Sequence, residues 1–328
     1  MSSSQPGLRT LHDVLVLASR APSVHNSQPW RWRLRGHELR LFADNDRAVR
    51  TADPHQRQMV LSLGATLDHC AAAAAAHGWG VDISRLPNPN RPDHLATVEF
   101  TGRTPILDAH RRRAAAIRDR YTDRLPLLAP PAEKLDEIVT FVASKSDTGV
   151  FVVPANSKDV LGQASRVSES MRRYDINYHD ELVWWTTRPL SQHDGIPAAA
   201  LITRSERERV ALARNFPQNG GEQPRRADVD SDAAAVVVLS TPGDARADLL
   251  RCGETLSELL IEATIAGLHS CTLSHVFESP ESSALIRGLL DDSATPQLIV
   301  RIGIRPHTDE DHARSARRDV EDILTVDN

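Results

Sequence analysis

The segment from Ala21 to Trp30 combines residue types that suit the recognition of a flat, polar ligand. Pro22 and Pro29 fix φ at two points and remove two backbone donors, so the loop is stiff. Between them lie hydroxyl and side-chain amide groups, on Ser23, Asn26, Ser27 and Gln28. Such groups can donate and accept hydrogen bonds along the edge of a heteroaromatic ring. The same pattern also fits an ordinary capped turn from a helix to a strand.

Basic residues form two clusters that could bind a phosphate. Arg120, Thr122 and Arg124 alternate along the chain, so an extended backbone places their side chains on one face. Two guanidinium groups and a hydroxyl on one face suit a phosphate. The second cluster contains Arg314, Arg317 and Arg318. Nearby acidic residues leave open the alternative of a solvated surface with balanced charges: Asp119, Asp123 and Asp319.

Composition narrows the class of protein. The 328 residues are enough for two domains, and a net charge of −5 argues against a general nucleic-acid-binding protein. No apolar run approaches the roughly 20 residues of a membrane span, and the first residues do not resemble a signal peptide. The scattered Cys70, Cys252 and Cys271 give no disulfide or zinc pattern and suit a reducing compartment. We therefore expect a cytoplasmic protein that binds neither nucleic acid nor membrane.

Hydrophobic periodicity indicates the elements that position these groups. Helical spacing predicts helices at residues 11–19, 56–76, 111–118 and 135–142. Alternation predicts a hairpin of residues 30–34 and 39–42, and strands near residues 98–100, 151–153, 234–240 and 298–304. Trp30 and Cys70 are expected in the core. Residues 184–227 have weak structural signals, with one short helix near residues 206–213. So long a stretch is usually functional, often a lid, or disordered.

The helix predicted at residues 56–76 recurs in the second half of the chain. Gly64-Ala-Thr-Leu67 aligns with Gly253-Glu-Thr-Leu256, and at the same offset Gly78 aligns with Gly267. Each helix leads into a strand-like stretch. The matched positions are small or apolar, which favours a duplicated unit over a chance match of two amphipathic helices. The boundary between the two units is expected near residues 103–113.

The loop, the basic clusters and their order resemble the nitroreductase family of FMN flavoproteins. Members of that family bind the FMN phosphate with an Arg-x-Ser-x-Arg motif and with basic residues near the C-terminus. A loop of the Ala-Pro-Ser-x-x-Asn-Ser-Gln-Pro-Trp type binds the flavin edge, and in the usual homodimer it comes from the other subunit. Here the loop lies in the first half, and residues 117–124 with Arg317 and Arg318 lie in the second. The chain is thus similar to a fused dimer with one complete flavin site.

The match fits the Acg-like branch of the family, which is linked with dormancy. Its markers here are Glu181-Leu-Val-Trp184 and Asp194-Gly-Ile-Pro197. The resemblance implies an α+β fold, duplicated in tandem as a pseudo-dimer, with mostly antiparallel sheets flanked by helices. It divides the chain into residues 1–110 and 111–328, with a candidate lid at about residues 184–227. Since the dimer is internal, a monomer in solution is expected.

The resemblance also implies a set of binding residues. The segment beneath the flavin falls on residues 270–274, which depart from the family's commoner Pro-x-Glu-Gly pattern. The implied cofactor-binding residues are Pro22, Ser23, Val24, Asn26, Gln28, Arg120, Thr122, Arg124, Thr272, Leu273, Ser274, Arg317 and Arg318. His25 and His275 could donate hydrogen bonds, although a histidine in a turn is more often structural.

The implied activity is NAD(P)H-driven reduction of a small nitroaromatic or quinone-type acceptor, with hydride transfer through N5 of FMN. The flavin carries the chemistry, so neither a catalytic side chain nor a metal is expected. The alternative is an FMN-storage protein whose closed lid excludes the nicotinamide. A Rossmann dehydrogenase, a zinc hydrolase and a serine hydrolase are disfavoured, because G-x-G-x-x-G, H-E-x-x-H and G-x-S-x-G are all missing.

Overall fold

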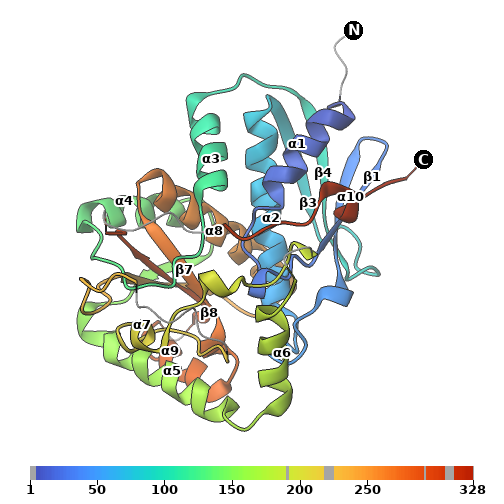
Figure 1. The fold of residues 1–328 in the computed structure, drawn as a ribbon. Helices are drawn as coiled ribbons and strands as arrows, with labels where there is room; N and C mark the ends of the chain where they lie inside the picture. Colours follow the sequence, from blue (N-terminus) through green and yellow to red (C-terminus); the bar gives the residue numbers. More distant parts are fainter. Residues whose placement is uncertain (1–4, 190–191, 218–224, 292, 307–313, 328) are drawn as a thin grey trace.

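Two sheets flanked by helices make up the fold (Figure 1). The computed structural model describes residues 5–189, 192–217, 225–291, 293–306 and 314–327. Within these residues the strands pair mostly antiparallel and both sheets are covered by helices. The predicted fold class, α+β with mostly antiparallel sheets, is confirmed.

The first sheet has the strand order β3-β4-β2-β1-β9. Its strands are β1 (Trp30–Arg35), β2 (Glu38–Ala43), β3 (Trp79–Arg85), β4 (His94–Arg103) and β9 (Leu324–Asp327). β1 and β2 form the predicted hairpin, and Gly36 in its turn has a φ of 58°, which glycine adopts without strain. β9 pairs parallel with β1, with Leu324 opposite Trp32. The first sheet is therefore completed by residues from the far end of the sequence.

The second sheet repeats this plan. Its strands are β5 (Gly149–Val152), β6 (Ala235–Thr241), β7 (His269–Leu273) and β8 (Thr295–Gly303). All pairs are antiparallel, and the order β7-β8-β6-β5 matches β3-β4-β2-β1 of the first sheet. The connections match as well, because α2 (Arg57–Ala76) joins β2 to β3 and α8 (Arg246–Ile265) joins β6 to β7. This agreement supports the expected duplication.

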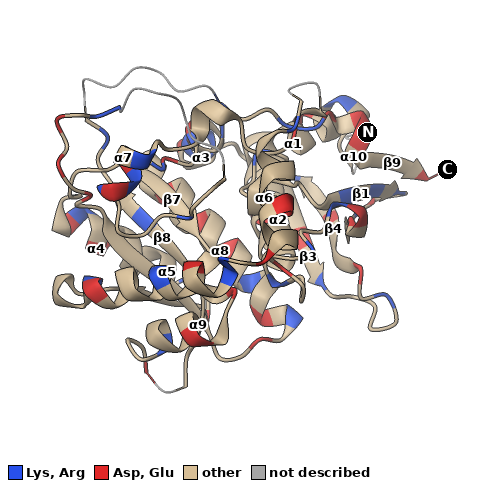
Figure 2. Ribbon diagram, turned by 60° about the horizontal axis from the view of Figure 1, so that its bottom comes forward, with Lys and Arg blue, Asp and Glu red and all other residues tan. Residues whose placement is uncertain are grey.

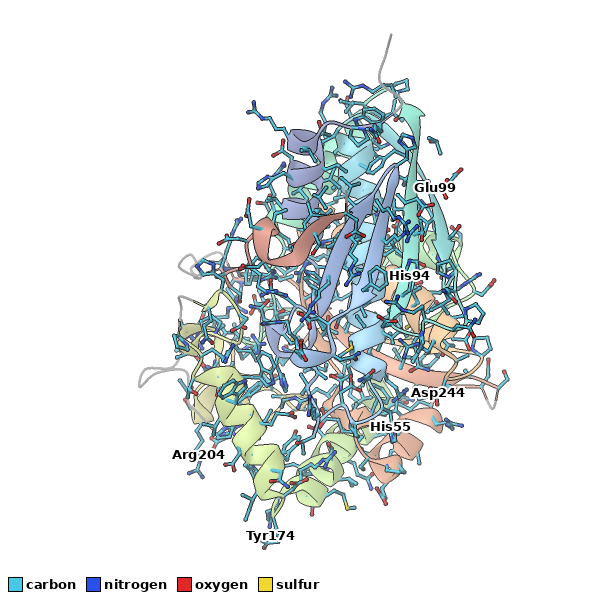
Figure 3. The ribbon with its side chains drawn as sticks, turned by 90° about the vertical axis from the view of Figure 1, so that its right-hand side faces the viewer. His55, His94, Glu99, Tyr174, Arg204 and Asp244 are labelled. Atoms are coloured by element: carbon cyan, nitrogen blue, oxygen red, sulfur yellow. The ribbon has the colours of Figure 1, made fainter. Side chains whose placement is uncertain are left out.

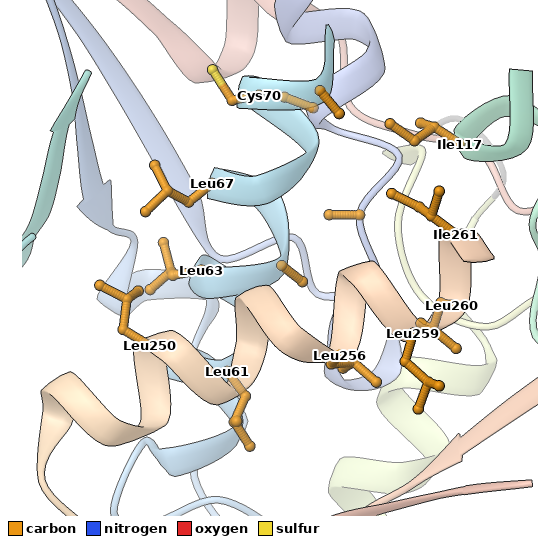
Figure 4. Packing of buried hydrophobic residues seen from close by; sticks show 14 of the residues in the cluster. Leu61, Leu63, Leu67, Cys70, Ile117, Leu250, Leu256, Leu259, Leu260 and Ile261 are labelled. Carbon is orange, nitrogen blue, oxygen red and sulfur yellow. The ribbon is translucent and has the colours of Figure 1, made fainter. Parts of the chain in front are cut away.

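Helices α2 and α8 pack against each other in the core (Figure 4). A Cβ atom on Gly64 would lie 2.0 Å from the carbonyl oxygen of Leu250. A Cβ atom on Gly253 would lie 2.1 Å from the carbonyl oxygen of Leu61. The two contacts exchange equivalent positions, as at an interface with two-fold symmetry. The matched glycines in the sequence therefore mark the point where the two backbones touch.

The remaining helices pack around this pair. α1 (Leu8–Ala18) and α3 (Asp108–Asp119) contact α2, and α4 (Ala132–Ala143) contacts α8. Helix α10 (Val320–Ile323) leads into β9 and contacts α1 and β1. Trp30 and Cys70 are fully buried in the main core, as predicted. The division of the chain at about residue 110 stays a prediction, and the contacts of α10 and β9 show that the chain's last elements pack on the first sheet.

Helices α5 (Lys158–Arg172), α6 (Ile176–Thr186) and α9 (Pro280–Arg287) lie in the lower part of the molecule in Figure 1. α5 packs against α9, and α6 follows α5 after a short turn. The sequence analysis did not assign α5 or α6. Tyr174, in the turn between them, is 88% exposed and lies at the edge of the molecule (Figure 3).

The helix expected at residues 206–213 is wrong, because α7 spans only Arg204–Glu208. Thr203 and Glu206 form a capping box that fixes the start of the helix. Beyond its end, Arg209 donates hydrogen bonds to the carbonyl oxygens of Arg225 and Val229. These bonds hold the chain to a neighbouring loop, and the helical turn does not continue.

Helix α2 is long and apolar enough to cross a membrane by length and composition, but 78% of that stretch is buried in the fold. This burial is typical of a core helix. Acidic and basic residues are interspersed along the helices and strands (Figure 2), which agrees with the small net charge.

Candidate functional site

The loop after α1 has an unusual backbone. His25, Asn26 and Gln28 have φ values of 50°, 55° and 50°, in the left-handed region that non-glycine residues rarely adopt. Ser23 stabilises the turn, because its Oγ accepts a hydrogen bond of 3.1 Å from the backbone N–H of Gln28. The Oγ of Ser62, on α2, accepts a bond of 3.3 Å from the N–H of Val24. The loop is thus held in a strained shape by its own hydroxyl and by the central helix.

Three arginines from distant parts of the chain converge beside this loop. Arg120 and Arg317 both donate to the carbonyl oxygen of Arg20, at 2.9 and 3.4 Å. Arg20 itself donates to the carbonyl oxygen of Ile117. Among the residues that the structure describes, none of these three arginines has a carboxylate within 4 Å. We call Arg20, Arg120 and Arg317 the arginine cluster.

Burial and mutual repulsion perturb the arginine cluster. Burial, followed by the charge of Arg20, lowers the pKa of Arg120 to about 10. Burial, followed by the charges of Arg120 and Arg20, lowers the pKa of Arg317 to about 9. Both side chains stay cationic at neutral pH, because these values lie above 7. A group of buried cations without a counter-ion is the electrostatic signature of an anion site.

Strand β7 positions the segment that carries Arg120, Thr122 and Arg124. Thr122 forms a parallel bridge with Ser270, and the N–H of Asp123 donates to the carbonyl oxygen of Ser270 at 2.8 Å. The segment is therefore extended at this point, which is the condition under which alternating side chains share one face. Just beyond β7, the Oγ of Ser274 donates to Oε1 of Gln58 on α2 at 2.5 Å.

These parts line one cavity. Its wall contains residues from the part of the chain that forms the first sheet and from the part that forms the second. The predicted binding residues on its wall are Pro22, Ser23, Val24, Asn26, Arg120, Thr122, Arg124, Thr272, Leu273, Ser274 and Arg317. Apolar side chains complete the wall, among them Leu61 of α2 and Leu256 of α8. The two ends of the sequence and its middle thus meet at one place.

Gln28 and Arg318 do not lie on this wall. They contact each other, because the backbone N–H of Arg318 donates to Oε1 of Gln28 at 2.9 Å. Gln28 also donates to the carbonyl oxygen of His193 at 2.8 Å, and Arg318 to that of Asp322. Their positions suit a structural joint under the loop, so we do not carry them into the binding site.

Part of the candidate lid forms another wall of the cavity. Of the described residues in 184–227, Ile196, Ala199, Ala200, Ile202, Leu212, Ala213, Arg214, Phe216 and Arg225 line it. This wall is fastened to the loop, since Nδ2 of Asn26 donates to the carbonyl oxygen of Gly195 at 3.0 Å. The buried carboxylate of Asp194 pairs with Arg47 and, at 2.8 Å, with Arg188. The pairing with these arginines helps to lower the pKa of Asp194.

Several residues of the wall were missed or undervalued by sequence reasoning. Arg20 is a lone arginine before the loop, and Gln58 is one polar residue on an apolar helix, so neither carries a sequence signal. Arg214 is buried against Glu278 and donates to the hydroxyl of Tyr178 at 3.0 Å. Only the tertiary structure brings these groups together.

Both histidines of the wall are buried and neutral. Burial, followed by the charge of Arg214, lowers the pKa of His275 to about 3, and its Nε2 lies 3.0 Å from the Oγ of Ser165. Burial and the charges of Arg214 and Arg124 lower the pKa of His25 well below its usual value. No group of three His, Cys, Asp or Glu side chains suited to a metal ion occurs within the described ranges.

Comparison with known proteins identifies the family. The chain is 42% identical over 317 residues to a Mycobacterium tuberculosis protein named "Putative NAD(P)H nitroreductase acg". The aligned residues cover 96% of this chain and 95% of that protein. The chain belongs to the Acg-like nitroreductase family. A second family member of the same organism, Rv3131, carries the same kind of name and is 32% identical over 327 residues, 99% of this chain and 93% of its own. No family model matches the chain.

Solved nitroreductases overlap with part of this Acg-like chain. The FMN- and NADPH-dependent nitroreductase NfnB of sphigopyxis sp. strain HMH is 14% identical with a TM-score of 0.44. It covers 66% of this chain and 99% of its own. The FMN-dependent NfnB of Mycobacterium smegmatis, solved with NADPH, is 15% identical with a TM-score of 0.38 and covers 62% of this chain and 91% of its own.

Proposed function

We propose that this Acg-like protein is an FMN-dependent NAD(P)H oxidoreductase that reduces nitroaromatic or quinone-type acceptors. The observation that carries the proposal is the arginine cluster of Arg20, Arg120 and Arg317. Arg120 is buried, Arg20 and Arg317 are partly buried, and the three cations repel one another; a phosphate dianion at their centre would remove that repulsion. The names of the M. tuberculosis relatives, NAD(P)H nitroreductases, support the reaction class.

The donors and acceptors of the cavity fit FMN. Within the described part of the chain, Nε of Arg120, Nε of Arg317 and Oδ1 of Asn26 are buried without a hydrogen-bond partner. Two guanidinium donors and the Thr122 hydroxyl suit the phosphate, while an unsatisfied amide oxygen in the loop suits an N–H on the edge of the ring. Buried polar atoms normally find partners, so their concentration in one cavity supports a bound polar ligand.

The protein's own groups bind and orient the reactants. Arg20, Arg120 and Arg317 would hold the phosphate, and Ser23 and Asn26 would fix the edge of the ring. The backbone at Leu273 and Ser274 would supply further donors. FMN, when bound, supplies hydride chemistry between a nicotinamide and an acceptor. The apolar wall keeps water from the ring, which strengthens the electrostatic interactions inside the cavity.

FMN storage is the second candidate, and the wall formed by residues 194–216 favours it. Asn26 and Arg47 fasten this wall to the first half of the chain, and Arg188 pairs with Asp194 within the candidate lid itself. A wall that stays fastened over the ring as a lid would retain FMN and exclude a nicotinamide. The two candidates share the binding site and differ only in whether a second molecule can enter.

Anaerobic reduction separates the two candidates. Purified protein should retain a yellow flavin through gel filtration, and a colourless protein that FMN cannot reconstitute would contradict both. A reductase loses its flavin absorbance when mixed with NADPH or NADH in a stopped-flow instrument. A storage protein loses it with dithionite but with neither nicotinamide.

The same reasoning gives the expected assembly. We propose one FMN for each chain, bound between the halves 1–110 and 111–328. A monomer acting in the cytoplasm follows from the internal pseudo-dimer and the cysteine pattern. Analytical ultracentrifugation and the flavin-to-protein ratio measure both quantities.

A further inference from the structure

The side chain of His25 is buried in the cavity wall. His25 is 7% exposed, and neither Nδ1 nor Nε2 has a hydrogen-bond partner among the residues that the structure describes. Its ring lies beside Phe216, with 6.0 Å between ring centroids and an edge-on angle of 70°. Arg124 and Arg214, which line the same cavity, are close enough for their charges to act on the imidazole. His25 is thus part of the cavity wall, and the described residues give its imidazole no hydrogen bond that would stabilise the loop itself.

The backbone of His25 adds a second cost. Its φ of 50° and ψ of 23° lie in the left-handed region, where a Cβ atom is unfavourable and glycine is the usual residue. A histidine here strains the backbone and also buries two unsatisfied nitrogens. The edge-on contact with Phe216 satisfies neither nitrogen, and within the described residues no hydrogen bond does. We therefore expect the imidazole of His25 to form its hydrogen bond when a ligand occupies the cavity.

We propose that His25 hydrogen-bonds the amide-like edge of the planar ligand in this cavity. A neutral imidazole has one N–H donor and one nitrogen acceptor, and a –CO–NH– edge presents the complementary pair. Protonation would remove the acceptor, and burial, followed by the charges of Arg214 and Arg124, opposes it by lowering the pKa of His25. Two molecules of the proposed function carry such an edge, the ring of FMN and the carboxamide of a nicotinamide. The inference rests on the proposed function and adds a residue to its binding site.

The test uses the full chain with His25→Gly and His25→Asn. Glycine removes the imidazole and relieves the strained φ, whereas asparagine tolerates the left-handed region and keeps a donor and an acceptor. FMN binding to the apoprotein is measured by quenching of flavin fluorescence. NADP⁺ binding to the FMN-loaded protein is measured by calorimetry, so neither readout depends on turnover.

For His25→Gly we expect a Kd raised about 5- to 30-fold for one of the two probes, since one or two neutral hydrogen bonds are lost. His25→Asn should recover part of that loss. Weaker FMN binding assigns the imidazole to the cofactor, and weaker NADP⁺ binding alone assigns it to the nicotinamide. Unchanged Kd values for both probes would overturn the inference while leaving the proposed function standing.

Measurements of thermal stability test the inference without any ligand. The melting temperature of His25→Gly apoprotein should equal that of the wild type or exceed it by up to about 3 °C, because the apoprotein loses strain. Gln56→Gly is the matched control, since Gln56 has a φ of 56° and does not line the cavity; it should leave both Kd values unchanged. A fall of several degrees for His25→Gly would make the imidazole a structural residue and refute the inference, even if the wild type binds no FMN.

Discussion

Replacing Arg317 by methionine should make the apoprotein more stable and its FMN binding weaker. The side chain is a buried cation whose pKa is lowered to about 9 by burial and by Arg120 and Arg20. This lowering from the ordinary pKa of an arginine corresponds to a cost of about 5 kcal/mol for keeping the charge in the folded apoprotein. Arg317 recovers part of it by donating to the carbonyl oxygens of Ser315, Ala316 and Arg20. At about 1 kcal/mol for each bond, methionine should stabilise the apoprotein by roughly 1–2 kcal/mol.

The pH dependence follows from the same shift. The folded state binds the proton of Arg317 more weakly than the unfolded state does, so the full cost is present at pH 7, below both pKa values. The cost falls as pH rises above about 9, and the free energy of unfolding of the wild-type apoprotein should rise there. Arg317→Met should lack this contribution. Urea unfolding at pH 7 and pH 10 measures the difference.

FMN binding should change in the opposite direction. A charge-assisted bond to a phosphate contributes about 1.5–3 kcal/mol, so the Kd for FMN should rise about 10- to 150-fold. Arg318→Met is the matched control, because the neighbouring Arg318 does not line the cavity; its Kd should stay within about two-fold of the wild type. If Arg317→Met kept wild-type affinity, or both variants lost it equally, the phosphate site would lie elsewhere.

Three further predictions test the helix crossing, a buried carboxylate and the fastening of the wall. Gly64→Ala should cost about 3 kcal/mol or more in urea unfolding, because its Cβ would meet the carbonyl oxygen of Leu250 at 2.0 Å. Burial raises the pKa of Asp68 to about 7. The free energy of unfolding of the wild type should therefore fall as the pH rises from about 4 to about 7, and Asp68→Asn should flatten this decline. Asp194→Asn should weaken the contacts with Arg47 and Arg188, and so speed FMN release and hydrogen exchange across residues 194–216.

Each of these three predictions has a control variant or an outcome that would contradict it. The Cβ atom of Gly7→Ala would meet no described atom within 4 Å, so this variant should be nearly neutral. An unchanged pH profile for Asp68→Asn would show that its carboxyl titrates normally. Unchanged exchange rates in Asp194→Asn would show that other contacts hold the wall in place.

Local patterns in the sequence predicted what depends on neighbours along the chain. Helix α2 and the β1–β2 hairpin follow from periodicity and a turn glycine, because each buries one face of a regular element. The match of Gly64 with Gly253 pointed to the crossing of α2 and α8, since close backbone contact demands a small residue at both positions. The left-handed φ of Gln28 has no such signal, and it turns this side chain away from the cavity toward Arg318.

The remaining parts of the site depend on long-range contacts. Arg20 joins Arg120 and Arg317 only because the two halves of the chain meet there, and a single arginine carries no spacing to reveal it. His25 was interpreted from its residue type, and its missing partners became visible only with the surrounding wall. A motif therefore indicated where the ligand lies, whereas the directions of individual side chains required the structure.

The parallel pairing of β9 with β1 has a consequence for the order of folding. Strand β9 lies roughly 220 residues after the end of β4, so the nascent first sheet must wait with one side of β1 unpaired during most of synthesis. The unpaired edge of such a strand can form hydrogen bonds with strands of other chains. Chaperone dependence in the cell and aggregation of truncated products are the costs to expect from a protein that closes its first sheet last.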